Sequence, residues 1–187
     1  MIQHTYHVMI DIETLSTRMD AAVVSVGMCI FEPTVQIICG ATEWATLPER
    51  EAHTDFETVR WWTQQTDSAR NAAFSIAESG RYTLPEMFNN MDDIIGVNTG
   101  RASNECYFWG MPAQFDLGIL EYWCKHYGIP TPWHYRKVMC ARTLFNLAKI
   151  ESKDRVQPLI AHRAADDARA QAETVMLAMK KLGIKEF

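Results

Sequence analysis

Three apolar runs near the start of the chain place the strongest constraint on its fold. Strand-like composition is found at residues 6–12, 22–31 and 35–40, and the connections between these runs, one of them at Pro33, are short. Neighbouring strands joined by short turns pair antiparallel, whereas parallel pairing needs a long crossover. The sequence therefore predicts that the fold opens with a three-stranded antiparallel meander.

Helices alternate with short strands in the rest of the chain. Apolar residues at helical spacing and end signals predict helices over residues 55–65, 68–78, 85–95, 112–127, 142–150 and 164–182. Strands are predicted at 105–109 and 137–140, and the helix between them allows parallel pairing. We therefore expect an α/β fold in which a mixed central sheet, with three antiparallel strands and then parallel strands, is flanked by helices. Residues 1–187 are expected to form a single domain.

The bulk composition is that of a folded protein from a reducing compartment. The five cysteines are odd in number and include no Cys-x-x-Cys pair, which indicates free thiols. The longest nearly apolar run, at residues 21–31, is shorter than the roughly 20 residues that span a bilayer, and the N-terminus lacks signal-peptide features. We therefore expect a cytoplasmic protein with no membrane partner.

Two acidic residues end the first predicted strand. Side chains alternate along a strand, so Asp11 and Glu13 point to one side while Ile10 and Ile12 point to the other. Adjacent carboxylates repel each other, and partial burial raises the cost unless a cation is present. An isolated Asp-x-Glu is more often a solvated strand end, so this pair gains weight only in combination with other residues.

The other acidic candidates begin helices. Asp116 falls early in the helix after the aromatic strand, where a lone Asp usually complements the helix dipole. Asp167 flanks the apolar stripe of the last helix, whereas Asp166 is expected to face solvent. Positions five apart do not share a helix face, so His162 can meet Asp167 only from the incoming loop. Alone, such a histidine is more often a surface or capping residue.

These five side chains form a recognisable set when they are taken together. Four carboxylates and one imidazole, each at a strand end or a helix start, have the composition of a two-metal hydrolytic site. Oxygen ligands favour Mg²⁺ or Mn²⁺ over zinc. The predicted metal ligands are Asp11, Glu13, Asp116 and Asp167, and His162 is predicted as the general base.

The ordered motifs Asp11-x-Glu13, Asp116 and His162-x-x-x-x-Asp167 resemble the three Exo motifs of DEDDh exonucleases. Each motif is weak alone, but their order and spacing match across nearly the whole chain. The resemblance implies a ribonuclease H-like fold, two Mg²⁺ or Mn²⁺ ions, and release of mononucleotides from a 3′ end. Some relatives act as dimers, so a homodimer is also expected.

Further segments resemble the subgroup that contains RNase AS and the phage DexA exonuclease. These are the helix with Trp61 and Trp62 and the segments 108–110 and 142–144, with a departure at residues 111–112 that concerns a local substrate contact. Adjacent helical residues point about 100° apart, so one tryptophan is expected in the core and the other to stack on a base. The predicted substrate-binding residues are Thr14, Leu15, Trp61, Trp62, Arg142 and Arg163.

The charge distribution is compatible with a phosphodiester substrate despite the net charge of −5. Four of the negative charges belong to the predicted metal ligands, and the segment from Arg136 to Arg163 contains seven basic and two acidic residues. The predicted partners are single-stranded RNA or DNA 3′ ends, with RNA slightly favoured. A DNA exonuclease is the main alternative, followed by a ribonuclease H-type endonuclease and an inactive nucleic-acid-binding module.

Overall fold

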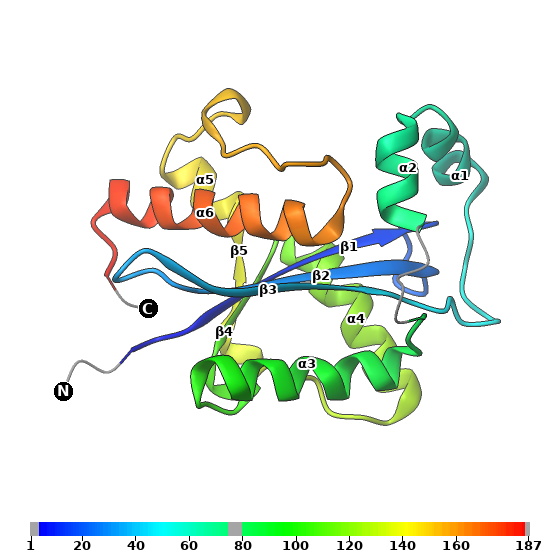
Figure 1. Cartoon of the computed structure of the whole chain (residues 1–187), viewed down its shortest axis with the longest axis horizontal. Helices are drawn as coiled ribbons and strands as arrows, with labels where there is room; N and C mark the ends of the chain where they lie inside the picture. Colours follow the sequence, from blue (N-terminus) through cyan, green and yellow to red (C-terminus); the bar gives the residue numbers. More distant parts are fainter. Residues whose placement is uncertain (1–3, 75–79, 186–187) are drawn as a thin grey trace.

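The computed structural model describes residues 4–74 and 80–185, which fold around one mixed sheet (Figure 1). Its strands are β1 (His7–Thr14), β2 (Val23–Glu32), β3 (Ile37–Ala45), β4 (Tyr107–Gly110) and β5 (Val138–Cys140). They lie in the order β3-β2-β1-β4-β5. β1, β2 and β3 form an antiparallel meander, and β4 and β5 extend the sheet by parallel pairing next to β1. The predicted α/β fold class is thus confirmed.

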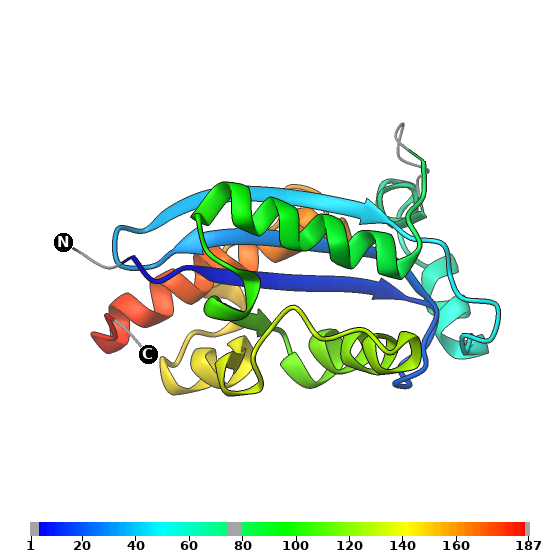
Figure 2. The ribbon, with the colours of Figure 1, turned by 90° about the horizontal axis from the view of Figure 1, so that it is seen from below.

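Helices cover both faces of the sheet. They are α1 (Phe56–Thr63), α2 (Asp67–Phe74), α3 (Leu84–Thr99), α4 (Ala113–Tyr127), α5 (Ala141–Leu147) and α6 (Ala164–Leu182). α5 and α6 lie on one face and α3 and α4 on the other, while α1 and α2 lie beyond the C-terminal end of β1 (Figures 1 and 2). Among the described residues, no helix combines the length and the apolar composition needed to cross a membrane.

The central strand β1 separates two hydrophobic layers. Val8, Ile10 and Ile12 belong to a core cluster that they share with α3 and α4, whereas Met9 belongs to a second cluster with α5 and α6. This is the alternation that the period of a strand dictates. β2 is buried along its whole length because helices cover both of its faces. All five cysteines are free thiols, as predicted.

A close contact between backbones fixes the start of α6 on the sheet. Gly27 of β2 lies directly opposite Asp11 of β1. A Cβ atom added at Gly27 would lie 2.0 Å from the carbonyl carbon of Ala164, the first residue of α6. No side chain fits in that space, so α6 rests on the backbone of β2. The two residues that flank this contact in sequence, His162 and Asp167, are thereby held over the end of the sheet.

The third strand differs from its predicted bounds. It was expected at residues 35–40 but runs from Ile37 to Ala45. β3 is an edge strand, and most of its residues are partly or fully exposed, so its second half has no continuous apolar pattern. Within that half, Glu43 pairs with Gly27 of β2 and lies near the start of α6.

Helix α3 ends later than the sequence predicts. α3 was expected to end near Ile95, but it continues through Gly96 to Thr99, and Gly100 closes it in the left-handed conformation with φ of 65°. Tertiary packing therefore carries the helix past a glycine that has a low helix propensity. The last part of the helix predicted at 68–78 lies outside the described residues.

Gly27→Ala is expected to destabilise the protein by about 3 kcal/mol, because the added methyl group collides with helix backbone that no side-chain rotation can move. Urea unfolding of the two proteins measures the difference. Gly96→Ala is the matched control, since a Cβ there meets nothing within 4 Å and alanine improves helix propensity. If Gly27→Ala were as stable as the wild type, the described seating of α6 on β2 would be wrong.

Candidate active site

Four carboxylates meet at the C-terminal end of β1. Asp11 and Glu13 leave the strand on the side opposite to its isoleucines, and Asp116 and Asp167 belong to the first turns of α4 and α6. The negative charges of Glu13, Asp116 and Asp167 all act on the Asp11 carboxyl group. The structure thus brings together four side chains from three separate segments of the sequence.

Hydrogen bonds from uncharged donors hold Asp11 and Asp116 in place. The side-chain amide of Gln171 donates to Oδ1 of Asp11 at 2.7 Å. The backbone N–H of Met111 donates to Oδ2 of Asp116 at 2.7 Å. Neither donor carries a positive charge that would offset the negative charge of the cluster.

His162 lies in the loop before α6, as its spacing from Asp167 requires. Its backbone N–H donates to Oδ2 of Asp167 at 2.7 Å, and its φ of 63° places it in the left-handed region. This conformation turns the imidazole toward the acids, where Nδ1 lies 3.8 Å from Oε1 of Glu13. The ring also meets the rings of Trp61 and Trp62 edge-on, with centroids 5.0 and 5.7 Å away.

Burial disfavours the charged forms of all four acids, and repulsion within the cluster adds to this effect at Asp11 and Glu13. Burial, followed by the charges of Asp116, Glu13 and Asp167, raises the pKa of Asp11 well above its ordinary value. Burial and then the charges of Asp167, Asp116 and Glu43 raise the pKa of Glu13. The cluster therefore holds protons, or needs a cation, at a pH where isolated carboxylates are ionised.

Burial also shifts the pKa values of Asp116, Asp167 and His162 toward the neutral form of each group. Burial raises the pKa of Asp116, opposed by hydrogen bonds from backbone and by the charge of Arg142. Burial raises the pKa of Asp167 to about 6, opposed by the hydrogen bond from the His162 backbone. Burial lowers the pKa of His162, so its imidazole is neutral near pH 7 and is not an ion-pair partner for Glu13.

The donor set fits a divalent cation. One ligand atom from each of Glu13, His162 and Asp167 lies within 4.8 Å of the others, and the Asp11 carboxylate adjoins this group. Carboxylate oxygens are the ligands that Mg²⁺ and Mn²⁺ prefer. A cation would relieve the repulsion that raises the pKa values of the acids, so the residues present suit the metal dependence of the DEDDh motifs.

A cavity of about 430 Å³ opens beside the acids and contains several of the predicted substrate-binding residues. Glu13, Thr14, Trp61, Trp62 and Phe115 are among the residues that line it. One of the two tryptophans is in the core, as predicted, and the stacking of the other on a base stays a prediction. Trp62 is buried and donates its indole N–H to the Thr14 carbonyl at 3.0 Å, whereas Trp61 is 42% exposed.

Leu15, Arg142 and Arg163 lie in different surroundings. The Leu15 N–H already donates to the Ala22 carbonyl at 2.9 Å, and Leu15 does not line the cavity beside the acids. Arg142 is exposed at the start of α5, and its charge acts on Asp116. Arg163 does not line the cavity beside the acids but lines a different one.

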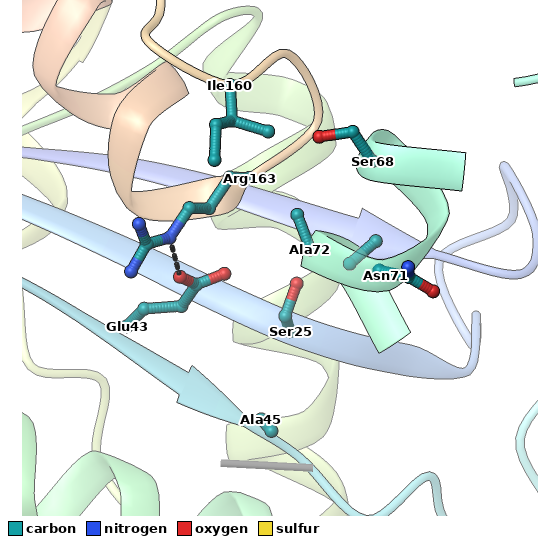
Figure 3. Close-up of a pocket in the computed structure, with 9 residues that line it drawn as sticks. Ser25, Glu43, Ala45, Ser68, Asn71, Ala72, Ile160 and Arg163 are labelled. Atoms are coloured by element: carbon teal, nitrogen blue, oxygen red, sulfur yellow. Dashed lines mark hydrogen bonds and ion pairs between the residues drawn. The ribbon is translucent and has the colours of Figure 1, made fainter. Parts of the chain in front are cut away.

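Arg163 forms part of a separate hollow between α2 and the edge of the sheet. Its Nε donates to Oε2 of Glu43 at 3.0 Å, and the pair lines a cavity of about 570 Å³ together with Ser25 and Asn71 (Figure 3). The guanidinium is thus paired with a carboxylate of β3. The role of Arg163 in substrate binding stays a prediction.

Sequence reasoning missed two residues near the site. Gln171 was not predicted, although it follows Asp167 by four positions and so shares its helix face. Asp166 was expected to face solvent, and this was wrong. It is partly buried, and its carboxylate accepts the Ile160 N–H at 3.1 Å because the incoming loop folds back over the helix start.

Solved structures of nucleases share this fold. The nuclease domain of 3′hExo, a DEDDh family member bound to rAMP, is 12% identical with a TM-score of 0.64 and covers 100% of this chain and 96% of its own. Cell-death related nuclease 4 is 15% identical with a TM-score of 0.59, over 97% of this chain and 66% of its own. E. coli exonuclease I in complex with a dA16 oligonucleotide is 11% identical with a TM-score of 0.64, over 96% and 42%. These likenesses confirm the predicted ribonuclease H-like fold.

The sequence itself matches a family model. No protein of curated function matches the chain significantly. The model of the 3′-5′ exoribonuclease Rv2179c-like domain, however, matches residues 6–179, which include all five residues of the acid and histidine cluster. The chain therefore belongs to the family of 3′-5′ exoribonuclease Rv2179c-like domains and is a nuclease with the DEDDh residue set.

Proposed function

We propose that this protein removes nucleotides one at a time from the 3′ end of single-stranded RNA and releases nucleoside 5′-monophosphates. The observation that carries the proposal is the cluster of four carboxylates and a neutral imidazole at the mouth of a cavity of about 430 Å³. Such a site has room for a terminal nucleoside on one side of the acids, which suits cleavage of the last phosphodiester.

RNA is the preferred substrate in this proposal, and DNA is the second candidate. The family description names an exoribonuclease. Among the structural neighbours, 3′hExo is described with rAMP and exonuclease I with a dA16 oligonucleotide, so related folds accept either sugar. A preference for RNA would depend on contacts to the 2′-hydroxyl group.

We further propose that two Mg²⁺ or Mn²⁺ ions occupy the acid cluster. Asp11, Glu13, Asp116 and Asp167 would hold them, and Asp11 would be the central ligand of the set because the charges of the other three carboxylates all act on it. When bound, the ions supply an activated water and stabilise the negative charge that develops at the phosphate. The protein contributes a fixed set of oxygens, oriented in part by Gln171.

His162 is the proposed general base. Its neutral imidazole can take the proton of the attacking water as the water oxygen bonds to phosphorus. The bond from phosphorus to O3′ of the penultimate nucleotide breaks, O3′ takes a proton from solvent, and the imidazolium returns its proton to solvent. The left-handed backbone at His162 and the rings of Trp61 and Trp62 keep the imidazole beside Glu13.

The cavity beside the acids is the proposed site of the terminal nucleoside. Trp61 is partly exposed there and offers a ring face or edge to a base, a contact that tolerates any sequence. Trp62 is buried and holds the Thr14 carbonyl, so it supports the cavity wall instead of stacking on a base.

Single-stranded RNA and DNA of one sequence, labelled at either end and incubated with Mg²⁺ or Mn²⁺, test the function. We expect 5′-labelled RNA to shorten progressively and 3′-labelled RNA to yield a labelled mononucleotide first, with DNA cleaved more slowly. Asp11→Asn is expected to show no turnover and controls for contaminating nuclease. Internal cuts without a ladder, or release of the 5′-terminal nucleotide first, would contradict the proposal.

His162→Gln is expected to lower kcat by about 10²- to 10⁴-fold, the usual contribution of a general base. Because burial lowers the histidine pKa, the wild-type rate should rise with pH through a value below about 6.5 and then level off, and the variant should lack that rise. Steady-state kinetics across pH measure both effects. The matched control is His126→Gln, because His126 lies on α4 and its imidazole contacts Glu51, away from the acids. Unchanged turnover in His162→Gln would exclude the histidine as the base.

A further inference from the structure

A second, smaller cavity lies on the other side of the acid cluster. It has a volume of about 210 Å³ and is formed where α6, α5 and the loop at residues 152–158 meet. Asp167 and Gln171 line it, so it adjoins the catalytic acids directly. The cavity beside Trp61, by contrast, adjoins the same cluster through Glu13. The acids therefore lie between two cavities.

Arg155 gives the second cavity a cationic wall. Its Nε atom is buried and donates no hydrogen bond to any of the residues that the structure describes. Its guanidinium carbon lies 5.2 Å from the centroid of the Phe145 ring, a cation–π contact that fixes the head group. The next residue, Val156, donates its N–H to the Thr174 hydroxyl at 3.1 Å and so ties the loop to α6.

Arg155 differs in this respect from the other arginines near the site. Arg163 donates its Nε to Glu43 and lines a different cavity. Arg142 is exposed at the start of α5. A buried guanidinium N–H without an acceptor is costly, and phosphate oxygens are among the acceptors that the geometry of a guanidinium matches. The second cavity is therefore lined both by a guanidinium whose Nε has no acceptor among the described residues and by Asp167 of the acid cluster.

We infer that Arg155 binds the phosphodiester one linkage 5′ of the scissile bond. This inference rests on the proposed function, in which the terminal nucleoside occupies the cavity beside Trp61 and the scissile phosphate lies over the acids. A chain that continues in the 5′ direction then enters the cavity lined by Asp167 and Arg155. Arg155 is thus a positioning residue for substrates of at least three nucleotides, because only these have two linkages.

The test compares three substrates in the presence of Mn²⁺. The first is an RNA trinucleotide, and the second is the same trinucleotide with an uncharged methylphosphonate in its 5′ linkage. The third is the p-nitrophenyl ester of a nucleoside 5′-monophosphate, which has a scissile phosphodiester but no second linkage. For the wild type, we expect the methylphosphonate to lower kcat/KM about tenfold for removal of the terminal nucleotide, the loss of one charge-assisted hydrogen bond.

Arg155→Gln should show a similar loss on the natural trinucleotide, mostly in KM. The methylphosphonate should then cause little further loss in this variant, because the partner of the missing charge is already gone. Arg136→Gln is the matched control, as it removes an exposed arginine before β5, at the opposite end of that strand from the acids. It should respond to the methylphosphonate as the wild type does.

The outcomes separate the inference from the function on which it rests. If the wild type hydrolyses the p-nitrophenyl ester but cleaves both trinucleotides equally well, the inference is overturned and the nuclease proposal stands. Equal sensitivity of Arg155→Gln and wild type to the methylphosphonate would also overturn it. If the wild type hydrolyses none of the three substrates, the proposed function itself fails.

Discussion

Four carboxylates at one end of a sheet repel one another, and the surrounding structure holds them together in spite of that repulsion. Asp11 is at the centre, since the charges of Glu13, Asp116 and Asp167 all act on it. Burial strengthens each of these interactions because little water is left to screen them. A folded chain tolerates such a group only if protons or cations neutralise part of it, and this requirement connects the fold to the proposed chemistry.

The scaffold positions these acids through contacts that carry no charge. Gln171 and the Met111 backbone donate hydrogen bonds to Asp11 and Asp116, so orientation is achieved without reducing the negative potential. The contact of α6 with Gly27 sets the height of the helix start above the sheet. A larger residue in that place would move His162 and Asp167 together, because both lie within three residues of the contact at Ala164.

Period and spacing in the sequence predicted the layers of the sheet and the residues that gather at its end. The alternation along β1 separated Asp11 from Ile10 correctly, and the spacing of His162 from Asp167 required a histidine outside the helix, where it is found. Adjacent placement of Trp61 and Trp62 predicted that one of them is buried.

Other features depend on contacts between distant segments and had no local signal. The last half of β3 lacks a strand pattern because it lies at an edge, and Asp166 turns inward only because the preceding loop returns over it. The position of Arg155 could not be predicted from the sequence either. Its sequence context resembles that of any surface arginine, and its place beside the acids follows from how the 152–158 loop is tied to α6.

Calorimetric titration of the metal-free protein with Mn²⁺, at about pH 8 and about pH 5, tests the central claim most directly. A cation that binds the four carboxylates must displace the protons that their raised pKa values retain. We therefore predict binding of two ions per chain near pH 8, and much weaker binding, with more protons released per ion, near pH 5. Absence of binding near pH 8 by a folded protein, or equal affinity at both pH values without proton release, would contradict the account.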